Sequence, residues 1–158
     1  MTGLRENGDL HKVVEQRLRR IDQRYTAGRR AIIGLLASAD HPVSIGEIAS
    51  GLPDLPRSSA YRHLVDLQAA GVVRRVAASD EFARFELAED LTGHHHHLLC
   101  LNCGKVTDVT YPAGLERRIS EAISQIAVAQ DFQPEWHVLD VLGICPACRL
   151  TPGSGQPA

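Results

Sequence analysis

Large side chains are scarce in this sequence of 158 residues. It has only three Phe, three Tyr, one Trp and one Met, so few residues can serve as large core anchors. No apolar run approaches the roughly 20 residues needed to span a bilayer, and the stretch MTGLRENGDLHK is too polar for a secretory signal. We therefore expect a cytoplasmic protein with modest cores, no membrane partner and some source of stability besides packing.

Cysteine is also rare, and its placement narrows the possible roles. The four cysteines form two Cys-x-x-Cys pairs, Cys100 with Cys103 and Cys145 with Cys148, with 41 residues between the pairs. In a reducing cytosol such pairs are more often metal ligands or redox groups than a disulfide framework. A thioredoxin-like pair would need to lie at a helix N-terminus, and an iron–sulfur cluster is a further alternative. We favour one structural Zn²⁺ with four thiolate ligands.

The net charge of −2 would by itself argue against nucleic-acid binding, but the charges are distributed unevenly along the chain. Residues 1–85 contain 13 Lys and Arg against 10 Asp and Glu, whereas residues 86–158 contain 4 against 9. A basic front half suits a polyanionic partner, and an acidic back half suits cations.

The front half has the pattern of a helical DNA-binding unit. Helical periodicity covers residues 10–21, 27–39, 45–52 and 56–71. Thr26 and Ser44 are the expected N-caps of the second and third helices. Two β-prone runs, VVRRVAA and FARFELA, then flank a polar turn and predict a hairpin. Three helices followed by a hairpin predict a winged helix-turn-helix, whose last helix enters the major groove.

The N-terminal face of that last helix suits DNA. It offers phosphate and base-edge donors, with an aromatic ring that can lie on a thymine methyl group. These residues are Arg57, Ser58, Ser59, Tyr61 and Arg62. The alternative is that Tyr61 belongs to the core and the arginines form a solvated face, but the hairpin that follows favours DNA binding.

The back half predicts a small α/β unit. GKVTDVTYP and WHVLDVLGI have the composition of strands, and an apolar stripe predicts a helix over residues 113–130 between them. A sheet covered by one helix leaves its edges unpaired and favours dimerisation. The expected fold class is α+β, an N-terminal winged helix-turn-helix followed by a small α/β dimerisation domain. The expected boundaries are 1–88 (with an extra N-terminal helix within 1–22), 89–150, and a disordered tail at 151–158.

Four consecutive histidines precede the first cysteine pair. Successive side chains of an extended segment point to opposite faces, so alternate histidines form two half-sites. Each half-site needs ligands of matching hardness, and the nearby acids and one further histidine suit them. The first set is His94, His96, Glu116 and His137, and the second is Glu86, His95, His97 and Asp108. Taken singly, His137 can be a satisfied strand histidine and Glu116 a helix-start charge that complements the macrodipole.

These residues resemble the ferric uptake regulator family, metal-dependent bacterial repressors that include iron, zinc, manganese, nickel and peroxide sensors. The resemblance rests on FELAED with HHHHLLCLNCGKV, on WHVLDVLGICPAC, on SSAYRHL and on RYTAGRR, and it spans about residues 24–149. It implies structural zinc at the cysteines, a dimer-core site at the first histidine set and a sensing site at the second. It also implies that Tyr61 and Arg62 read the major groove. In the basic entry segment, Arg24 is expected to reach the minor groove and Arg29 is expected to contact DNA as well.

The resemblance further implies a homodimeric repressor of metal uptake or homeostasis genes, bound to a pseudo-palindromic operator in double-stranded DNA with a divalent metal as corepressor. Fe²⁺, Zn²⁺ and Mn²⁺ stay open as the regulatory ion, because two imidazoles with two carboxylates suit each of them. Iron-type members place a histidine where Pro42 stands, and here His41 is one residue early. A peroxide-sensing regulator of the same family and a structural zinc module without DNA binding are the alternatives.

A metal-dependent hydrolase is the competing class, and the sequence does not support it. The chain has no His-Glu-x-x-His motif, and Leu98 and Leu99 follow the histidines where a metallo-hydrolase motif would continue. A barrel that uses His-x-His needs about 200 residues or more. We do not expect an enzyme.

Overall fold

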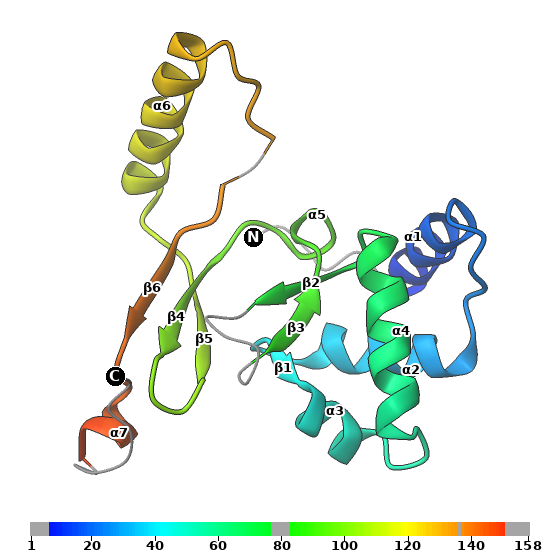
Figure 1. Cartoon of the computed structure of the whole chain (residues 1–158). Helices are drawn as coiled ribbons and strands as arrows, with labels where there is room; N and C mark the ends of the chain where they lie inside the picture. Colours follow the sequence, from blue (N-terminus) through cyan, green and yellow to red (C-terminus); the bar gives the residue numbers. More distant parts are fainter. Residues whose placement is uncertain (1–6, 77–82, 136, 151–158) are drawn as a thin grey trace.

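The computed structural model describes residues 7–76, 83–135 and 137–150. Within these residues the chain forms two neighbouring units (Figure 1). The first contains α1 (Asn7–Arg19), α2 (Ala27–Ser38), β1 (Val43–Ser44), α3 (Ile45–Gly51), α4 (Arg57–Ala69), β2 (Val73–Val76) and β3 (Arg84–Leu87). The second contains α5 (Glu89–Thr92), β4 (His96–Cys100), β5 (Val106–Val109), α6 (Ala113–Ala129), β6 (Asp140–Gly143) and α7 (Pro146–Leu150).

Some of the sequence predictions fall on residues that the structure does not describe. The extra N-terminal helix expected within residues 1–22 corresponds to α1, which is described from Asn7 onward. The polar turn expected between the two β-prone runs falls on residues 77–82, and the expected disordered tail falls on residues 151–158. Both lie outside the described residues, as do residues 1–6 and Trp136.

Side-chain caps set the starts of the helices in the first unit. The Thr26 hydroxyl accepts a hydrogen bond from the backbone N–H of Arg29 (3.4 Å). The Ser44 hydroxyl accepts from the N–H of Glu47 (3.2 Å), and the Glu47 carboxylate accepts from the N–H of Ser44 (2.8 Å). This capping box satisfies two donors that the helix itself cannot. At the other end of α4, Gly71 has a φ of +65° and ends the helix in the left-handed region.

The first unit is a winged helix-turn-helix, as the sequence predicts. Helices α2, α3 and α4 precede the hairpin of β2 and β3, and the sheet has the order β1-β3-β2 with antiparallel pairing. Strand β1 has only two residues, too few to show a period in the sequence. Fully buried aliphatic side chains fill the core, and each contributes about 1.5–3 kcal/mol by leaving water. They include Val14, Leu18, Ile32, Ile33, Ile48, Leu64, Leu67 and Val72.

The second unit is built on a three-stranded sheet with the order β5-β4-β6. Strand β4 pairs antiparallel with β5 and parallel with β6. The sequence predicts the strands on either side and the helix between them, but not that the histidine segment is the central strand. The predicted second strand is also shorter than expected: β6 begins at Asp140, so His137 precedes it rather than lying on it.

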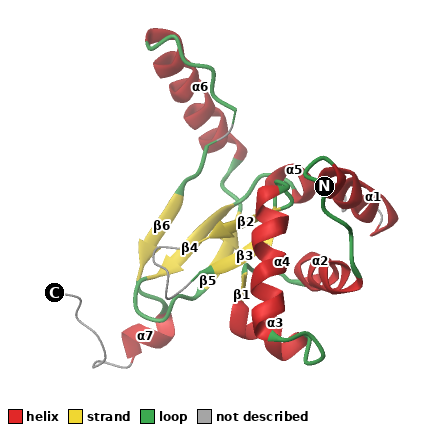
Figure 2. Cartoon of the chain, turned by 45° about the vertical axis from the view of Figure 1, so that its right-hand side comes forward, coloured by secondary structure: helices red, strands yellow, loops and turns green. Residues whose placement is uncertain are grey.

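The second unit has little apolar core of its own. Within the described residues, its buried apolar cluster consists of Leu99 and Val106 with Val76 of β2. Helix α6 stands away from both sheets (Figure 2), and Ala127 is its buried residue. Among the described helices, none has both the length and the apolar character required to cross a membrane. The stability of this unit therefore depends on contacts other than its own packing.

Candidate metal centres

The four cysteines converge although 41 residues separate the two pairs. Cys100 ends β4 and Cys145 follows β6, and these strands are parallel neighbours. The N–H of Cys145 donates to the sulfur of Cys100 (3.3 Å), and the sulfurs of Cys103 and Cys145 are 3.8 Å apart. A tetrahedron with metal–sulfur bonds of about 2.3 Å has sulfurs about 3.8 Å apart. We call these four residues the cysteine cluster.

The electrostatics of the cysteine cluster suit a cation. Burial alone would raise the pKa of the Cys100 thiol, but backbone N–H groups from Cys145 and Cys103 donate to its sulfur and lower the pKa to about 6. Hydrogen bonds with Cys103 and Cys145 raise the pKa of Cys148 to about 12. The Cys100 thiolate therefore forms readily, whereas a second thiolate at Cys148 is unfavourable without a cation. A divalent cation would offset the negative charge of the thiolates, so the donor set fits the structural zinc predicted from the sequence.

The first histidine set also converges. The ligand atoms of His94, His96, Glu116 and His137, which we call the Glu116 cluster, lie within 4.8 Å of one another. The carboxylate of Glu116, in the first turn of α6, lies 2.5 Å from Nε2 of His96, 3.3 Å from Nε2 of His94 and 3.7 Å from Nε2 of His137. Leu115, the residue before Glu116 in α6, has no ligand atom and is 42% exposed. Glu116 is therefore the helix residue that meets the histidines.

The surroundings of the Glu116 cluster orient its ligands. The ring of Tyr111 stacks on His96 with centroids 4.4 Å apart. Nδ1 of His94 hydrogen-bonds to Glu89, which leaves Nε2 facing Glu116. Nε2 of His137 is buried without a hydrogen-bond partner among the described residues. A buried nitrogen with no donor or acceptor costs free energy, and a metal ion would satisfy it, so this cluster also fits a cation.

The second histidine set joins the two units of the chain. Its residues, which we call the Glu86 cluster, are Glu86, His95, His97 and Asp108, with ligand atoms within 4.8 Å of one another. Oε2 of Glu86, on β3 of the winged unit, lies 3.2 Å from Nε2 of both His95 and His97. Asp108 pairs with His97 in the β4–β5 register and lies 3.9 Å from its Nε2. The cluster therefore holds ligands from both units.

The charges in the Glu86 cluster are strongly coupled. Burial would raise the pKa of Glu86, but hydrogen bonds with His95 and His97 lower it to about 2. Contact with Glu86 raises the pKa of His95 to about 9 and, against the effect of burial, also raises that of His97. Burial raises the pKa of Asp108. Two carboxylates facing two imidazoles require positive charge between them, which protons or a divalent cation can supply.

Three further residues orient the Glu86 and Glu116 clusters, and the sequence analysis missed them. Asp140 lies 2.9 Å from Nδ1 of His97, Arg74 donates from its Nε to the second carboxylate oxygen of Glu86, and Glu89 contacts His94. Two of the three had a signal in the sequence. Asp140 is a lone charge in an apolar strand, and Arg74 is the cross-strand partner of Glu86 in the hairpin.

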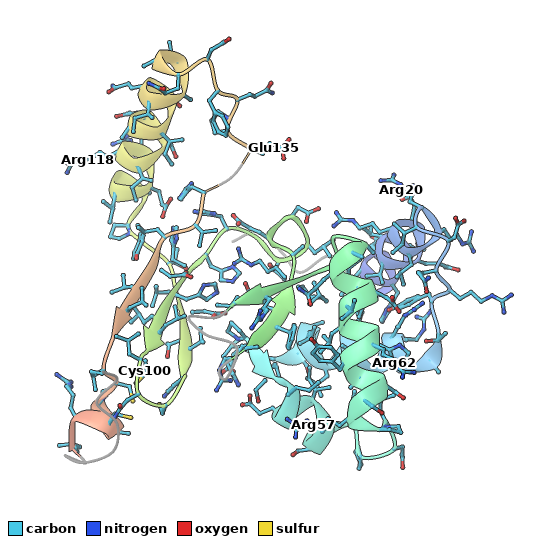
Figure 3. All side chains as sticks on the ribbon, in the orientation of Figure 1. Arg20, Arg57, Arg62, Cys100, Arg118 and Glu135 are labelled. Carbon is cyan, nitrogen blue, oxygen red and sulfur yellow. The ribbon has the colours of Figure 1, made fainter. Side chains whose placement is uncertain are left out.

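The helix that is predicted to meet DNA exposes most of the expected residues. Arg57, Ser58, Tyr61 and Arg62 are exposed on α4, and Ser59 is half-buried. Figure 3 labels Arg57 and Arg62 on this helix. Tyr61 is 60% exposed, so it is not a core aromatic. Val65, an apolar residue of the same helix, is also 49% exposed.

The basic entry segment divides into an exposed and a buried part. Arg24 is exposed, whereas Arg29 is 6% exposed. The guanidinium of Arg29 donates to Asp66 of α4, to Oε1 of Gln23 (2.7 Å) and to the carbonyl of Arg24. The expected DNA contact of Arg29 is therefore wrong. A buried arginine needs charge and hydrogen-bond partners, and Arg29 uses them to join α2 to α4.

His41, whose role the sequence left open, belongs to none of the three clusters. Its Nδ1 lies 2.7 Å from Asp40 and its Nε2 lies 3.4 Å from Glu47. Both ring nitrogens thus face carboxylates of the winged unit.

Comparisons with known proteins show the family of this chain. The model of the ferric uptake regulator family matches residues 20–141. The peroxide-responsive repressor PerR of Staphylococcus aureus is 31% identical over 137 residues, which cover 84% of this chain and 86% of PerR. The crystal structure of the Vibrio cholerae ferric uptake regulator matches with a TM-score of 0.62 and 29% identity, over 83% of this chain and 98% of that one. The Helicobacter pylori ferric uptake regulator matches with a TM-score of 0.75 over 97% of this chain and 100% of that one, and at 20% identity this likeness shows the fold alone. The chain belongs to the ferric uptake regulator family.

Proposed function

We propose that this protein is a metal-responsive transcriptional repressor, which binds a pseudo-palindromic operator as a homodimer with a divalent metal as corepressor and controls genes of metal uptake or homeostasis. The observation that carries the proposal is the Glu86 cluster, whose ligands come from both units of the chain. The relative from Staphylococcus aureus is a repressor, and the Vibrio cholerae regulator has DNA-binding domains. Both support a regulator of transcription rather than an enzyme.

In this proposal each part of the chain has a separate task. Residues 1–88 form the DNA-binding domain with its extra N-terminal helix within 1–22, residues 89–150 form the dimerisation domain, and 151–158 form a tail. The cysteine cluster holds structural Zn²⁺, and the Glu116 and Glu86 clusters each hold a further divalent ion. Fe²⁺, Zn²⁺ and Mn²⁺ are the candidates for the regulatory ion, and the ferric uptake regulator of Pseudomonas aeruginosa, at 26% identity and a TM-score of 0.64, was solved with manganese.

The Glu86 cluster can link metal to DNA because of where its residues lie. Glu86 belongs to β3, which pairs with β1, and β1 leads directly into α3 of the helix-turn-helix. His97 and Asp108 belong to the sheet of the second unit. A divalent ion bound here would supply the positive charge that holds both carboxylates and both imidazoles together. Fixing β3 against β4 fixes the winged unit, and in a dimer this sets the recognition helices about 34 Å apart.

The homodimer is supported by the exposed apolar surface of the second unit. Monomeric proteins rarely expose large contiguous apolar patches, and a second copy of the chain would cover this one. The exposed side chains lie on α6, on β6 and in the segments beside them. They are Leu115, Ile126, Val128, Phe132, Val138, Leu139, Val141, Leu142 and Ile144.

The DNA contacts follow from exposure and charge on the winged unit. Arg57, Ser58, Tyr61 and Arg62 are exposed along the first turns of α4, where a recognition helix meets base edges. Ser59 is half-buried and can donate to a phosphate, and Arg24 is exposed before α2. Arg29 supports this surface from beneath without touching DNA.

Operator affinity with and without metal tests the proposal. DNA ligands are selected from a random duplex pool with metal-loaded protein, and the affinity for the selected duplex is then measured by fluorescence anisotropy. We expect metal to tighten binding by roughly 5- to 150-fold, the usual range of allosteric coupling. Glu86→Gln should abolish the difference. Glu135→Gln, which removes an exposed carboxylate that is not part of the Glu86 cluster, should keep it (Figure 3 labels Glu135).

Two outcomes would contradict parts of the proposal. Equal operator affinity with and without metal in the unmodified protein would remove the corepressor role. The structural zinc module without DNA binding predicts no selected duplex at all and no effect of Arg62→Ala on any binding, whereas the repressor requires Arg62→Ala to weaken operator binding.

Peroxide sensing is the second candidate function, because the relative from Staphylococcus aureus is a peroxide-responsive repressor. In this mode iron bound at the Glu86 cluster would promote oxidation of His95 or His97 by hydrogen peroxide. Peptide mass spectrometry after peroxide treatment of the Fe²⁺-loaded protein should then find one added oxygen atom on a ligand histidine, with loss of operator binding. The Mn²⁺-loaded protein is the control. Unmodified histidines with retained DNA binding would leave metal sensing as the function.

A further inference from the structure

Arg84 joins three parts of the chain that are far apart in the sequence. From β3, its Nε donates to the carbonyl of Gly104 (2.7 Å), and one Nη donates to the carbonyl of Pro42 (3.1 Å) and to the Glu47 carboxylate (2.8 Å). The side chain is 16% exposed. A guanidinium has five N–H donors in a fixed fork, so its bonds set the relative positions of its acceptors.

The first acceptor belongs to the cysteine cluster. Gly104 directly follows Cys103 and has a φ of +66°, and its N–H donates to the carbonyl of Cys100 (3.0 Å). This turn places the first two cysteines of the cluster. The position of the Gly104 carbonyl therefore depends on whether the cysteine cluster is intact.

The other acceptors belong to the helix-turn-helix. Glu47 closes the capping box at the start of α3, and Pro42 directly precedes β1. Burial would raise the pKa of Glu47, but hydrogen bonds with Ser44 and the charge of Arg84 lower it to about 2. The Glu47 carboxylate is therefore ionised at neutral pH, and it forms a charge-assisted hydrogen bond to Arg84. Helix α3 packs against α4, which carries the exposed DNA-facing residues.

We propose that Arg84 is a positioning residue, which holds the helix-turn-helix in a fixed orientation against the cysteine cluster and makes the order of α3 depend on that cluster. The cysteine cluster then does more than stabilise the second unit, since its loss releases the Gly104 carbonyl and loosens the start of α3. Any weakening of operator binding that follows from a loosened α3 rests on the proposed function, whereas the loosening of α3 itself does not.

Hydrogen exchange of the full-length protein, without DNA, tests this dependence. The first readout is the exchange rate of the amides of α3 in the zinc-loaded unmodified protein, Arg84→Gln and Arg84→Lys. We expect α3 to exchange about tenfold faster in Arg84→Gln, because a local opening loses its restraint. Arg84→Lys should restore part of the protection through its charge. Arg20→Gln, which removes an exposed arginine just after α1 and far from Cys100 (Figure 3), should leave the exchange of α3 unchanged.

The second readout combines each variant with loss of one zinc ligand, Cys148→Ser. In the otherwise unmodified chain we expect this loss to speed exchange of α3 by about tenfold, and in Arg84→Gln by less than about twofold, because the link is already broken. The amides of α2 report whether the winged unit stays folded. Native mass spectrometry counts zinc per chain in each protein.

Two results would overturn the proposal. Unchanged exchange of α3 in zinc-loaded Arg84→Gln would show that Arg84 holds nothing in place. Equal effects of Cys148→Ser with and without Arg84 would show that the cysteine cluster acts on α3 by another route. Both readouts are made without DNA, so a failure of the repressor function would leave them decisive.

Discussion

Asp140 should set the metal affinity of the Glu86 cluster without being a ligand. Its carboxylate lies 2.9 Å from Nδ1 of His97, which is 2% exposed, and β6 places it beside β4 in parallel register with His97. Accepting the Nδ1–H bond fixes the tautomer whose Nε2 lone pair faces Glu86. Loss of such an outer partner typically lowers metal affinity by about 10- to 100-fold.

Two substitutions separate the charge of Asp140 from its hydrogen bond. Asp140→Leu removes both, so we expect the full loss, equivalent to about 1.4–2.7 kcal/mol of binding free energy. In Asp140→Asn the amide oxygen still accepts from His97. Neutral hydrogen bonds are about half as strong as charge-assisted ones, so a loss of about 3- to 10-fold is expected. Asp54→Asn removes an exposed carboxylate between α3 and α4 and should change nothing.

The assay is competition with a chelating dye for Mn²⁺ or Zn²⁺, in a Glu116→Gln background that disables the other histidine cluster. The cysteine cluster keeps its zinc, which native mass spectrometry verifies in each variant. Unchanged affinity in Asp140→Leu would refute the reasoning. The Asp140→Leu substitution is also made in the chain that keeps Glu116. If it lowered the metal affinity of the Glu116 cluster by the same factor, the cause would be a general loosening of the sheet.

The remaining predictions concern pH and stability. Contact with Glu86 raises the pKa of His95 to about 9, so below that pH a metal ion must displace a proton from the imidazole. Metal affinity should therefore rise with pH up to about 9. Dye competition between pH 6.5 and 9.5 measures this, and an affinity that levels off near pH 6.5 would contradict the prediction. Ser44→Ala removes the hydroxyl that accepts from Glu47, and urea unfolding should show a loss of about 1 kcal/mol. Leu64→Ala truncates a fully buried side chain and should cost about 2–5 kcal/mol in the same assay, whereas a loss below 1 kcal/mol would place Leu64 outside the core.

The sequence predicts those parts of the fold that local patterns determine. Helix starts at Thr26 and Ser44 follow from caps, and the division of the histidines into two sets follows from the period of an extended chain. Both depend on residues close to one another in the chain. The convergence of the two cysteine pairs was also predictable, because thiolates at that spacing have few other roles in a reducing compartment.

The sequence does not reveal features that depend on distant partners. Arg29 looks like a solvated charge until Asp66, 37 residues away, meets it. Strand β4 has no apolar–polar alternation, because each face is buried by a different cluster: both His96 and His97 are 2% exposed. A polar run buried on both faces has no hydrophobic period, so the usual signal of a central strand is absent.

The register of β4 ties the three clusters together. Side chains alternate along a strand, so a slip of β4 by one residue would turn every histidine to the opposite face and dismantle both histidine clusters at once. The histidines alone cannot prevent such a slip, because each has another histidine as a chain neighbour, which could take its place after a shift by one residue. The cysteine cluster can prevent it: Cys100 closes β4, and the N–H of Cys145, just beyond β6, donates to its sulfur. Structural zinc in this chain would therefore specify which histidines share a site, and loss of the cysteine cluster should abolish metal binding at both the Glu116 and the Glu86 cluster together.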